Sequence, residues 1–183
     1  MSNRHGGERV PDHHGAAEVA SSPCALDDVD PAWRGLADAA EIRALLAELL
    51  AAERAGARGI TELCLPAGPA TARGVLVALA RDEGRCCSML VAQLRRYGSD
   101  AAGPPGAFLE RLAAAPDFPA RLALLDRGQA WVVRRIDAAL PRLADAALIA
   151  DLRWMRTLHV ENIARARRVA EAVVPAGEAP GSA

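Results

Sequence analysis

Apolar residues recur at every third or fourth position along almost the whole chain between residues 38 and 173. This period matches one face of an α-helix, and no segment shows the alternation with β-branched enrichment that is typical of a strand. The pattern therefore predicts an all-α fold. With 183 residues, the chain is long enough for one domain with a substantial core.

Turn residues divide the helical pattern into four long helices. Asp38 is an N-cap candidate for the first, with Glu41 three residues later. The second predicted helix ends at Gly98, and the other three end near prolines. A long middle connection holds one short helix near residues 107–114. The arrangement predicts two antiparallel helix pairs joined by a crossover, which is one way to build a four-helix bundle. The long helices are expected over about residues 38–64, 70–97, 118–140 and 145–173.

The two ends of the chain lack the helical period. Residues 1–30 are rich in Gly, Ser, His, Pro and charge, and we expect a disordered arm there. Residues 175–183 are expected to form a disordered tail, which leaves residues 31–174 as the folded domain. His5, His13 and His14 fall in the arm, where their spacing has no fixed geometry behind it, so we expect them to be solvated.

The charge balance argues against partners that are bound through bulk charge. The chain has 22 basic residues, all arginine, and 23 acidic residues, with a formal net charge of −1. Nucleic-acid and anionic-membrane binding normally need a basic excess. No apolar run approaches the roughly 18 residues that span a bilayer, and none resembles a signal peptide. We expect a cytoplasmic protein with free thiols, without nucleic-acid or membrane partners.

Each long helix carries polar residues within its apolar stripe. A carboxylate that faces a core is costly unless it is paired, protonated or bound to a metal. Glu53 and Glu83 are separated by 30 positions, as are Gln129 and His159, and also Asp126 and Arg156. Distances from the turns place these residues at similar heights, so we expect one polar layer in the core. The candidate residues of this layer are Glu53, Glu83, Cys86, Asp126, Gln129, Arg156, His159 and Asn162.

The phrases ELLAAERAGAR, RDEGRCCSML, LLDRGQAWVVRR and MRTLHVENI resemble a bacterial family of ferritin-like domains whose function is not known. The similarity covers about residues 42–168. Ferritin-like di-iron proteins place a Glu on each of two helices and a Glu-x-x-His motif on each of the other two. The resemblance therefore implies a ferritin-like four-helix bundle with a metal site in its core.

The di-iron ligand pattern of that superfamily is incomplete in this chain. Glu53 matches the Glu of the first helix, and Glu83 matches a motif Glu with Cys86 in the place of its His. Asp126 or Gln129 stands in the third-helix position. On the fourth helix, His159 fits either the motif His, with Arg156 in the Glu place, or the motif Glu, with Asn162 in the His place. Two bridged irons need about four acidic ligands, so a dinuclear oxidase is not expected.

Two classes of function follow. In the first, Glu53, Glu83, His159 and Cys86 bind one iron, manganese or zinc ion; if the chain is then an enzyme, it is a metal-dependent oxidoreductase with a small-molecule substrate of unknown identity. In the second, arginines near the layer, above all Arg156, convert the site into a structural salt-bridge network. The chain then acts by dimerising or by binding a protein partner, through an apolar surface around Phe108 and Phe118. A cavity at the polar layer favours the first class, and an arginine that fills it favours the second.

Overall fold

The computed structural model of the chain describes residues 35–100 and 107–173. Every regular element within these ranges is helical, which confirms the predicted all-α fold. Two helices are short, α2 (Leu65–Ala67) and α4 (Phe108–Ala113). The arm, its three histidines and the tail lie outside the described residues. The long helices are α1 (Ala39–Gly59), α3 (Arg73–Arg96), α5 (Phe118–Ala139) and α6 (Ala146–Val173).

The ends of the long helices follow from local sequence. Asp38 is the N-cap of α1, as expected: its carboxylate accepts from the Glu41 N–H at 2.8 Å, and the Glu41 carboxylate accepts from the Asp38 N–H at 3.1 Å. After α3, Gly98 has a φ of 68°, and the Ser99 N–H donates to the Leu94 carbonyl at 3.0 Å. Only glycine takes this backbone conformation without strain, so the chain turns out of the helix there.

The first predicted helix is not α-helical up to its end. Residues Ile60–Cys64 form a π-helical segment, in which the Leu65 N–H donates to the Ile60 carbonyl five residues earlier. Arg121 of α5 donates a hydrogen bond from Nη1 to the Leu63 carbonyl at 3.0 Å, within this segment. A single π turn adds only one residue to the helix, so the spacing of the apolar residues stays close to that of an α-helix. The apolar period alone therefore did not reveal the π-helical segment.

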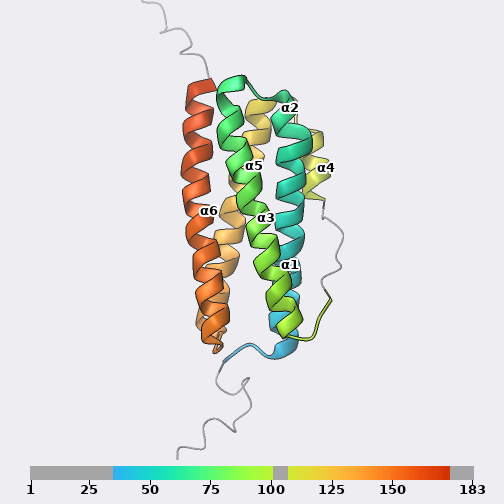
Figure 1. Cartoon of the computed structure of the whole chain (residues 1–183), viewed down its shortest axis with the longest axis vertical. Helices are drawn as coiled ribbons and strands as arrows, with labels where there is room; N and C mark the ends of the chain where they lie inside the picture. Colours follow the sequence, from blue (N-terminus) through green and yellow to red (C-terminus); the bar gives the residue numbers. More distant parts are fainter. Residues whose placement is uncertain (1–34, 101–106, 174–183) are drawn as a thin grey trace, which may run out of the picture. The chain divides into compact units, whose positions relative to one another are not determined.

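The four long helices lie side by side, as Figure 1 shows. Helix α1 packs mainly against α3, and α5 packs mainly against α6. The apolar core has two parts. Leu46 and Leu49 of α1 belong to one part, and Ile60, the first residue of the π-helical segment after α1, belongs to the other. Glu53 lies between them in the sequence. Each of the other long helices also has a polar residue between members of the two clusters, in the same order along α6 and in the reverse order along α3 and α5, so polar residues separate the two clusters.

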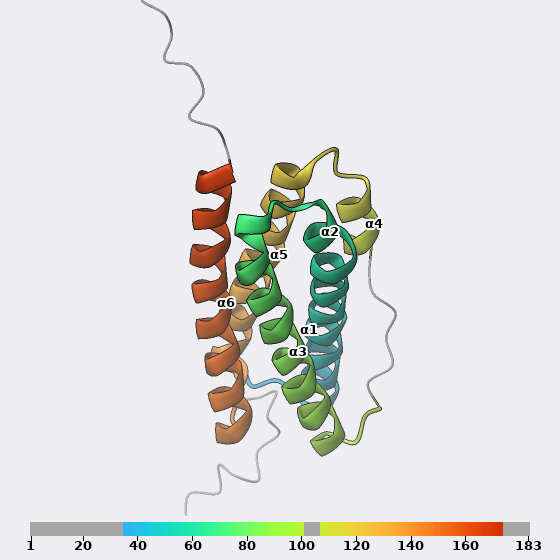
Figure 2. The same ribbon diagram turned by 45° about the horizontal axis from the view of Figure 1, so that its top comes forward.

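The short helix α4 rests against the outer side of the long helices (Figure 2). Two glycines allow this close approach. A Cβ atom at Gly59 of α1 would lie 2.4 Å from a methyl carbon of Leu112, and one at Gly128 of α5 would lie 3.2 Å from the Phe108 ring. The predicted docking surface around Phe108 and Phe118 needs correction, because Phe118 is buried in the core and Phe108 packs against Gly128.

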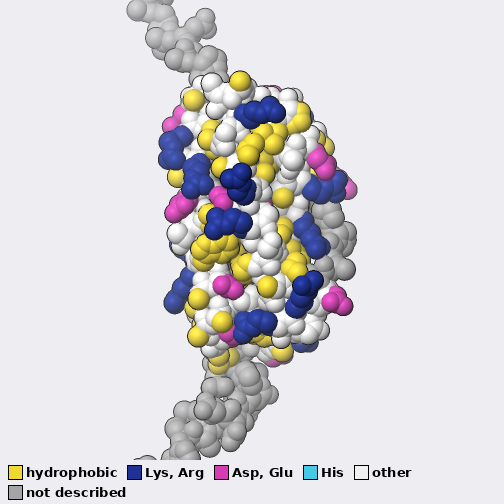
Figure 3. Space-filling model, viewed as in Figure 1, with side chains coloured by type: hydrophobic (Ala, Val, Ile, Leu, Met, Phe, Trp, Pro, Cys, Tyr) yellow, Lys and Arg dark blue, Asp and Glu magenta, His cyan; other side chains and the backbone are white. Residues whose placement is uncertain are grey.

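The surface of the described residues is mixed in character. Figure 3 shows arginines and acidic side chains interspersed with apolar atoms on one face, without a continuous basic surface there. Within residues 35–100 and 107–173, none of the helices combines the length and the apolar character that a transmembrane span needs.

Candidate metal centre

Helices α1 and α6 bring Glu53 and His159 together in the core. The Oε1 atom of Glu53 lies 3.0 Å from Nε2 of His159, and each side chain is 1% exposed. The two residues are 106 positions apart in the sequence. The pairing therefore depends on how the two helix pairs pack together, and a hydrogen bond of this kind is strong because water does not compete with it.

The orientation of His159 is fixed by its own helix. Its Nδ1 atom lies 2.9 Å from the carbonyl oxygen of Met155, one turn earlier. A carbonyl only accepts hydrogen bonds, so Nδ1 carries the proton and donates it. In the neutral ring Nε2 then presents its lone pair to Glu53. Histidines that bind metals commonly hold their second nitrogen in this way, which leaves the first free to act as a ligand.

Helices α3 and α5 contribute a second hydrogen bond to the layer. The side-chain amide of Gln129 donates to Oε1 of Glu83, and both residues are buried. The 30-residue spacing relates this bond to the first one. Glu53 and Glu83 form one pair of residues that are 30 positions apart, and Gln129 and His159 form the other. Each hydrogen bond joins one residue of the first pair to one residue of the second: Glu53 contacts His159, and Glu83 contacts Gln129. The four residues that the 30-residue spacing relates therefore form the two hydrogen bonds of the layer.

Burial makes both carboxyl groups reluctant to ionise. It raises the pKa of Glu53 from its ordinary value to about 7, although hydrogen bonding from Glu83 and Cys86 counteracts part of the rise. Burial also raises the pKa of Glu83 well above its ordinary value, and the nearby charge of Glu53 adds to this effect.

Cys86 completes the group of ligand atoms. The Glu53 carboxylate, the His159 ring nitrogen and the Cys86 sulfur all lie within 4.8 Å of one another, and all three residues are buried. Burial, followed by the charges of Glu53 and Glu83, raises the pKa of the Cys86 thiol. The apo site therefore favours the protonated thiol, and a cation would have to displace that proton.

The layer is not fully satisfied by its own hydrogen bonds. Oε2 of Glu53 and Oε1 of Gln129 are buried without a partner of standard hydrogen-bond geometry among the described residues. Oxygen atoms of this kind are rare in folded proteins, because each one costs the free energy of its lost hydration. Both atoms belong to the polar layer, so an additional hydrogen-bond donor or a cation could be accommodated there.

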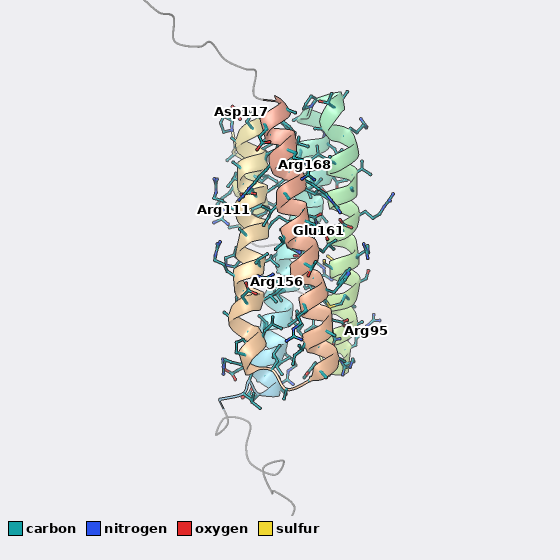
Figure 4. The ribbon with its side chains drawn as sticks, turned by 90° about the vertical axis from the view of Figure 1, so that its left-hand side faces the viewer. Arg95, Arg111, Asp117, Arg156, Glu161 and Arg168 are labelled. Atoms are coloured by element: carbon teal, nitrogen blue, oxygen red, sulfur yellow. The ribbon has the colours of Figure 1, made fainter. Side chains whose placement is uncertain are left out.

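Two residues that we expected in the layer lie elsewhere. Arg156, with a side chain that is 40% exposed, forms a 2.5 Å ion pair with Asp137 on the outer side of α5 and α6 (Figure 4). Asp126 pairs with Arg167 at 3.1 Å, also toward the surface. The expectation that Arg156 fills the site is therefore wrong. The position three residues before His159 turns outward, and a long guanidinium is better solvated at the surface than in the core.

Asn162 is buried, but its hydrogen bond is to Arg165 and not to Glu53. Its Oδ1 atom accepts from Nη1 of Arg165 at 3.2 Å, and the same Nη1 atom donates to Asp82 at 3.1 Å. Asp82 also pairs with Arg85. This second network joins α3 to α6 beside the layer. Sequence reasoning did not single out Asp82, because it stands next to Glu83, outside the apolar stripe.

A cavity of about 660 Å³ reaches the polar layer. Glu53, Glu83 and Gln129 lie in its wall, together with small residues of α1 and apolar residues of α4 and α5. Its volume lies within the range of small-molecule sites. The small residues Ala51, Ala52, Ala55 and Gly56 were the sequence signal for this space, but we did not use it. The cavity and the outward position of Arg156 together favour a ligand site over a salt-bridged core.

A comparison of the chain with protein families identifies a domain family that it matches. Residues 40–169 match the family described as Domain of unknown function (DUF6306). The chain belongs to this family. The DUF6306 match spans all four long helices and includes Glu53, Glu83, Cys86, Gln129 and His159. The chain matches no curated protein and no solved structure.

Gly56 of α1 provides the space that the Glu83 carboxyl occupies. A Cβ atom at Gly56 would lie 2.8 Å from Oε2 of Glu83. We expect Gly56→Ala to lower the free energy of unfolding by roughly 1–3 kcal/mol, because the buried carboxyl has to shift. Gly84→Ala is the matched control: Gly84 is exposed within α3, a Cβ there meets open space, and a gain of about 0.5–1 kcal/mol is expected. Urea denaturation of both variants tests this, and equal effects would contradict the assignment.

Proposed function

We propose that this protein is a ferritin-like four-helix bundle that binds one divalent metal ion through Glu53, His159 and Cys86. The observation that carries the proposal is the convergence of these three ligand atoms within 4.8 Å, in a buried layer that a cavity reaches. Buried groups of this kind need a proton or a cation to balance them. Glu83 lies beside the ligands, where it acts as a fourth ligand or holds a proton.

The hydrogen bonds of the layer support one register of the ferritin-like pattern. Gln129, rather than Asp126, is the α5 residue that contacts Glu83, so it occupies the third-helix Glu place. His159 occupies the motif Glu place, and Asn162, three residues later, occupies the motif His place. The contact of His159 with Glu53 agrees with this correspondence. Two glutamates in the layer suit one ion rather than a bridged pair.

The donor set favours zinc, followed by iron or manganese. Zinc takes carboxylate, imidazole and thiolate ligands together, and three protein ligands leave one position open for water or a substrate. A metal ion bound there would supply Lewis-acid chemistry at the end of the cavity. Iron in the same ligands would make an oxidoreductase the expected class. In either case His159 supplies a neutral ligand, and Glu53 supplies a negative charge.

The metal content of the purified protein tests the proposal. Full-length protein, purified without an affinity tag or chelator, is expected to hold about one zinc or iron ion per chain by elemental mass spectrometry. Glu53→Gln keeps the size of the side chain but removes the anionic ligand, so its metal content should fall close to zero.

The histidines of the arm need their own control. A variant with His5, His13 and His14 all changed to alanine should keep its metal, because the ligands that we propose are Glu53, His159 and Cys86. If the wild-type protein holds no metal even after incubation with zinc and with ferrous iron, the metal-site proposal is wrong.

A further inference from the structure

The cavity beside the polar layer has walls and a rim of different chemistry. Its walls are apolar, with Ala52, Ala55, Phe108, Leu125 and Val132 among the lining residues. Three arginines also line it, Arg111 from α4 and Arg127 and Arg134 from α5, and all three are exposed. A molecule that fills the cavity therefore meets apolar side chains inside and guanidinium groups at the entrance.

The arginines at the rim have no acidic partner among the residues that the structure describes. Within the described ranges, neither an ion pair nor a hydrogen bond is formed by the side chains of Arg111, Arg127 and Arg134. The one exposed carboxylate that lines the cavity, Glu48, is held by Arg135 at 2.7 Å. An entrance lined by one sign of charge concentrates ligands of the opposite sign. The rim is thus suited to an anion.

We infer that this cavity binds an amphipathic organic anion, with an apolar body of the fatty-acid type and its carboxylate at the rim arginines. The charges set its direction. The inner end already holds the carboxyl groups of Glu53 and Glu83, which disfavour a third one, whereas arginine binds carboxylates well. The apolar end of the molecule therefore points toward the polar layer. This inference rests on the proposed function for the chemistry at that end, since it places the apolar end beside the metal ligands.

Laurate and dodecanol, which have the same chain length, test the class of ligand. Isothermal titration calorimetry below the micelle concentration should give one laurate per chain. Dodecanol should bind at least about tenfold more weakly, because exposed charge pairs of modest strength add up to about that factor. Equal binding of the two compounds, or no saturable laurate binding, would overturn the inference.

Variants of the rim and the wall test the location. Arg127→Gln combined with Arg134→Gln should weaken laurate binding about tenfold, whereas Arg95→Gln, on α3 across from Arg111 in Figure 4, should leave it within about twofold. Ala52→Phe should abolish binding by filling the cavity. Ala92→Phe, on the exposed side of α3, is its matched control. Laurate binding that these cavity variants leave unchanged would place the ligand elsewhere and overturn the inference.

The metal and the anion can be tested separately. Laurate titrations are run on metal-loaded and on metal-free protein, and metal content is measured on Ala52→Phe. Laurate binding that depends on the rim arginines supports the inference, whether or not the protein holds metal. A protein that holds its metal but gives no arginine-dependent laurate binding refutes the inference and leaves the metal site standing.

Discussion

The metal-free protein is expected to lose at least about 2.5 kcal/mol of its free energy of unfolding between pH 5 and pH 8. In the folded state the pKa of Glu53 is about 7, above the ordinary 4.5. At low pH both states bind the proton. Between these two values the folded state still holds a proton that the unfolded state has released, so stability falls as the pH rises. The raised pKa of Glu83 acts in the same direction.

Urea denaturation at pH 5 and pH 8, in the presence of a chelator, measures this loss. Glu53→Gln removes the titrating group but keeps its size, so the stability of this variant should change less between the two pH values than that of the wild-type protein, by about 2.5 kcal/mol. If the wild-type protein and Glu53→Gln show the same dependence on pH, Glu53 does not titrate in the core and the description of the layer fails.

His159→Ala is expected to weaken zinc binding by at least about a hundredfold. Loss of a group that only orients a ligand costs roughly 10–100-fold, and loss of the ligand itself should cost more. The measurement is a competition titration against a zinc-binding dye. Asn162→Ala is the matched control, because Asn162 is equally buried one turn further along α6 but contacts Arg165. It should change the affinity by less than about tenfold.

Circular dichroism shows whether the His159→Ala variant is folded, so that a loss of zinc binding is not confused with unfolding. His159→Ala leaves the other buried groups of the layer in place, and its helix content should stay close to that of the wild-type protein. A folded His159→Ala variant that binds zinc as tightly as the wild-type protein would remove His159 from the ligand set.

The residues in the centre of the layer were predictable from the sequence because helical spacing is rigid. Glu53, Glu83, Gln129 and His159 each interrupt an apolar stripe, and the counts from the turns set their heights. Arg156 and Asp126 were misplaced because they stand at the edges of those stripes. At such a position, a small rotation of the helix decides whether a side chain points inward or outward. The ion pairs with Asp137 and Arg167 settle that choice, and they depend on packing across helices.

The ends of the helices were equally predictable, whereas the cavity was not. The Asp38 cap and the Gly98 turn depend on residues within one or two turns of each other. The cavity depends on how far α1 and α5 stand apart and on where α4 rests, and these distances come from long-range packing. The π-helical segment Ile60–Cys64 was missed for a related reason, because its apolar residues keep facing the core.

The position of α4 on Gly59 and Gly128 separates two tasks that often share the same residues in small proteins. The proposed metal ligands come from α1, α3 and α6, whereas Phe108 and Arg111 of α4 line the cavity. Substitutions in this six-residue helix can therefore change which molecules are admitted without disturbing the ligand group. The exposed positions of α4, such as Arg111, can therefore vary without contact with the buried ligand group, whereas Leu112 is held in the core.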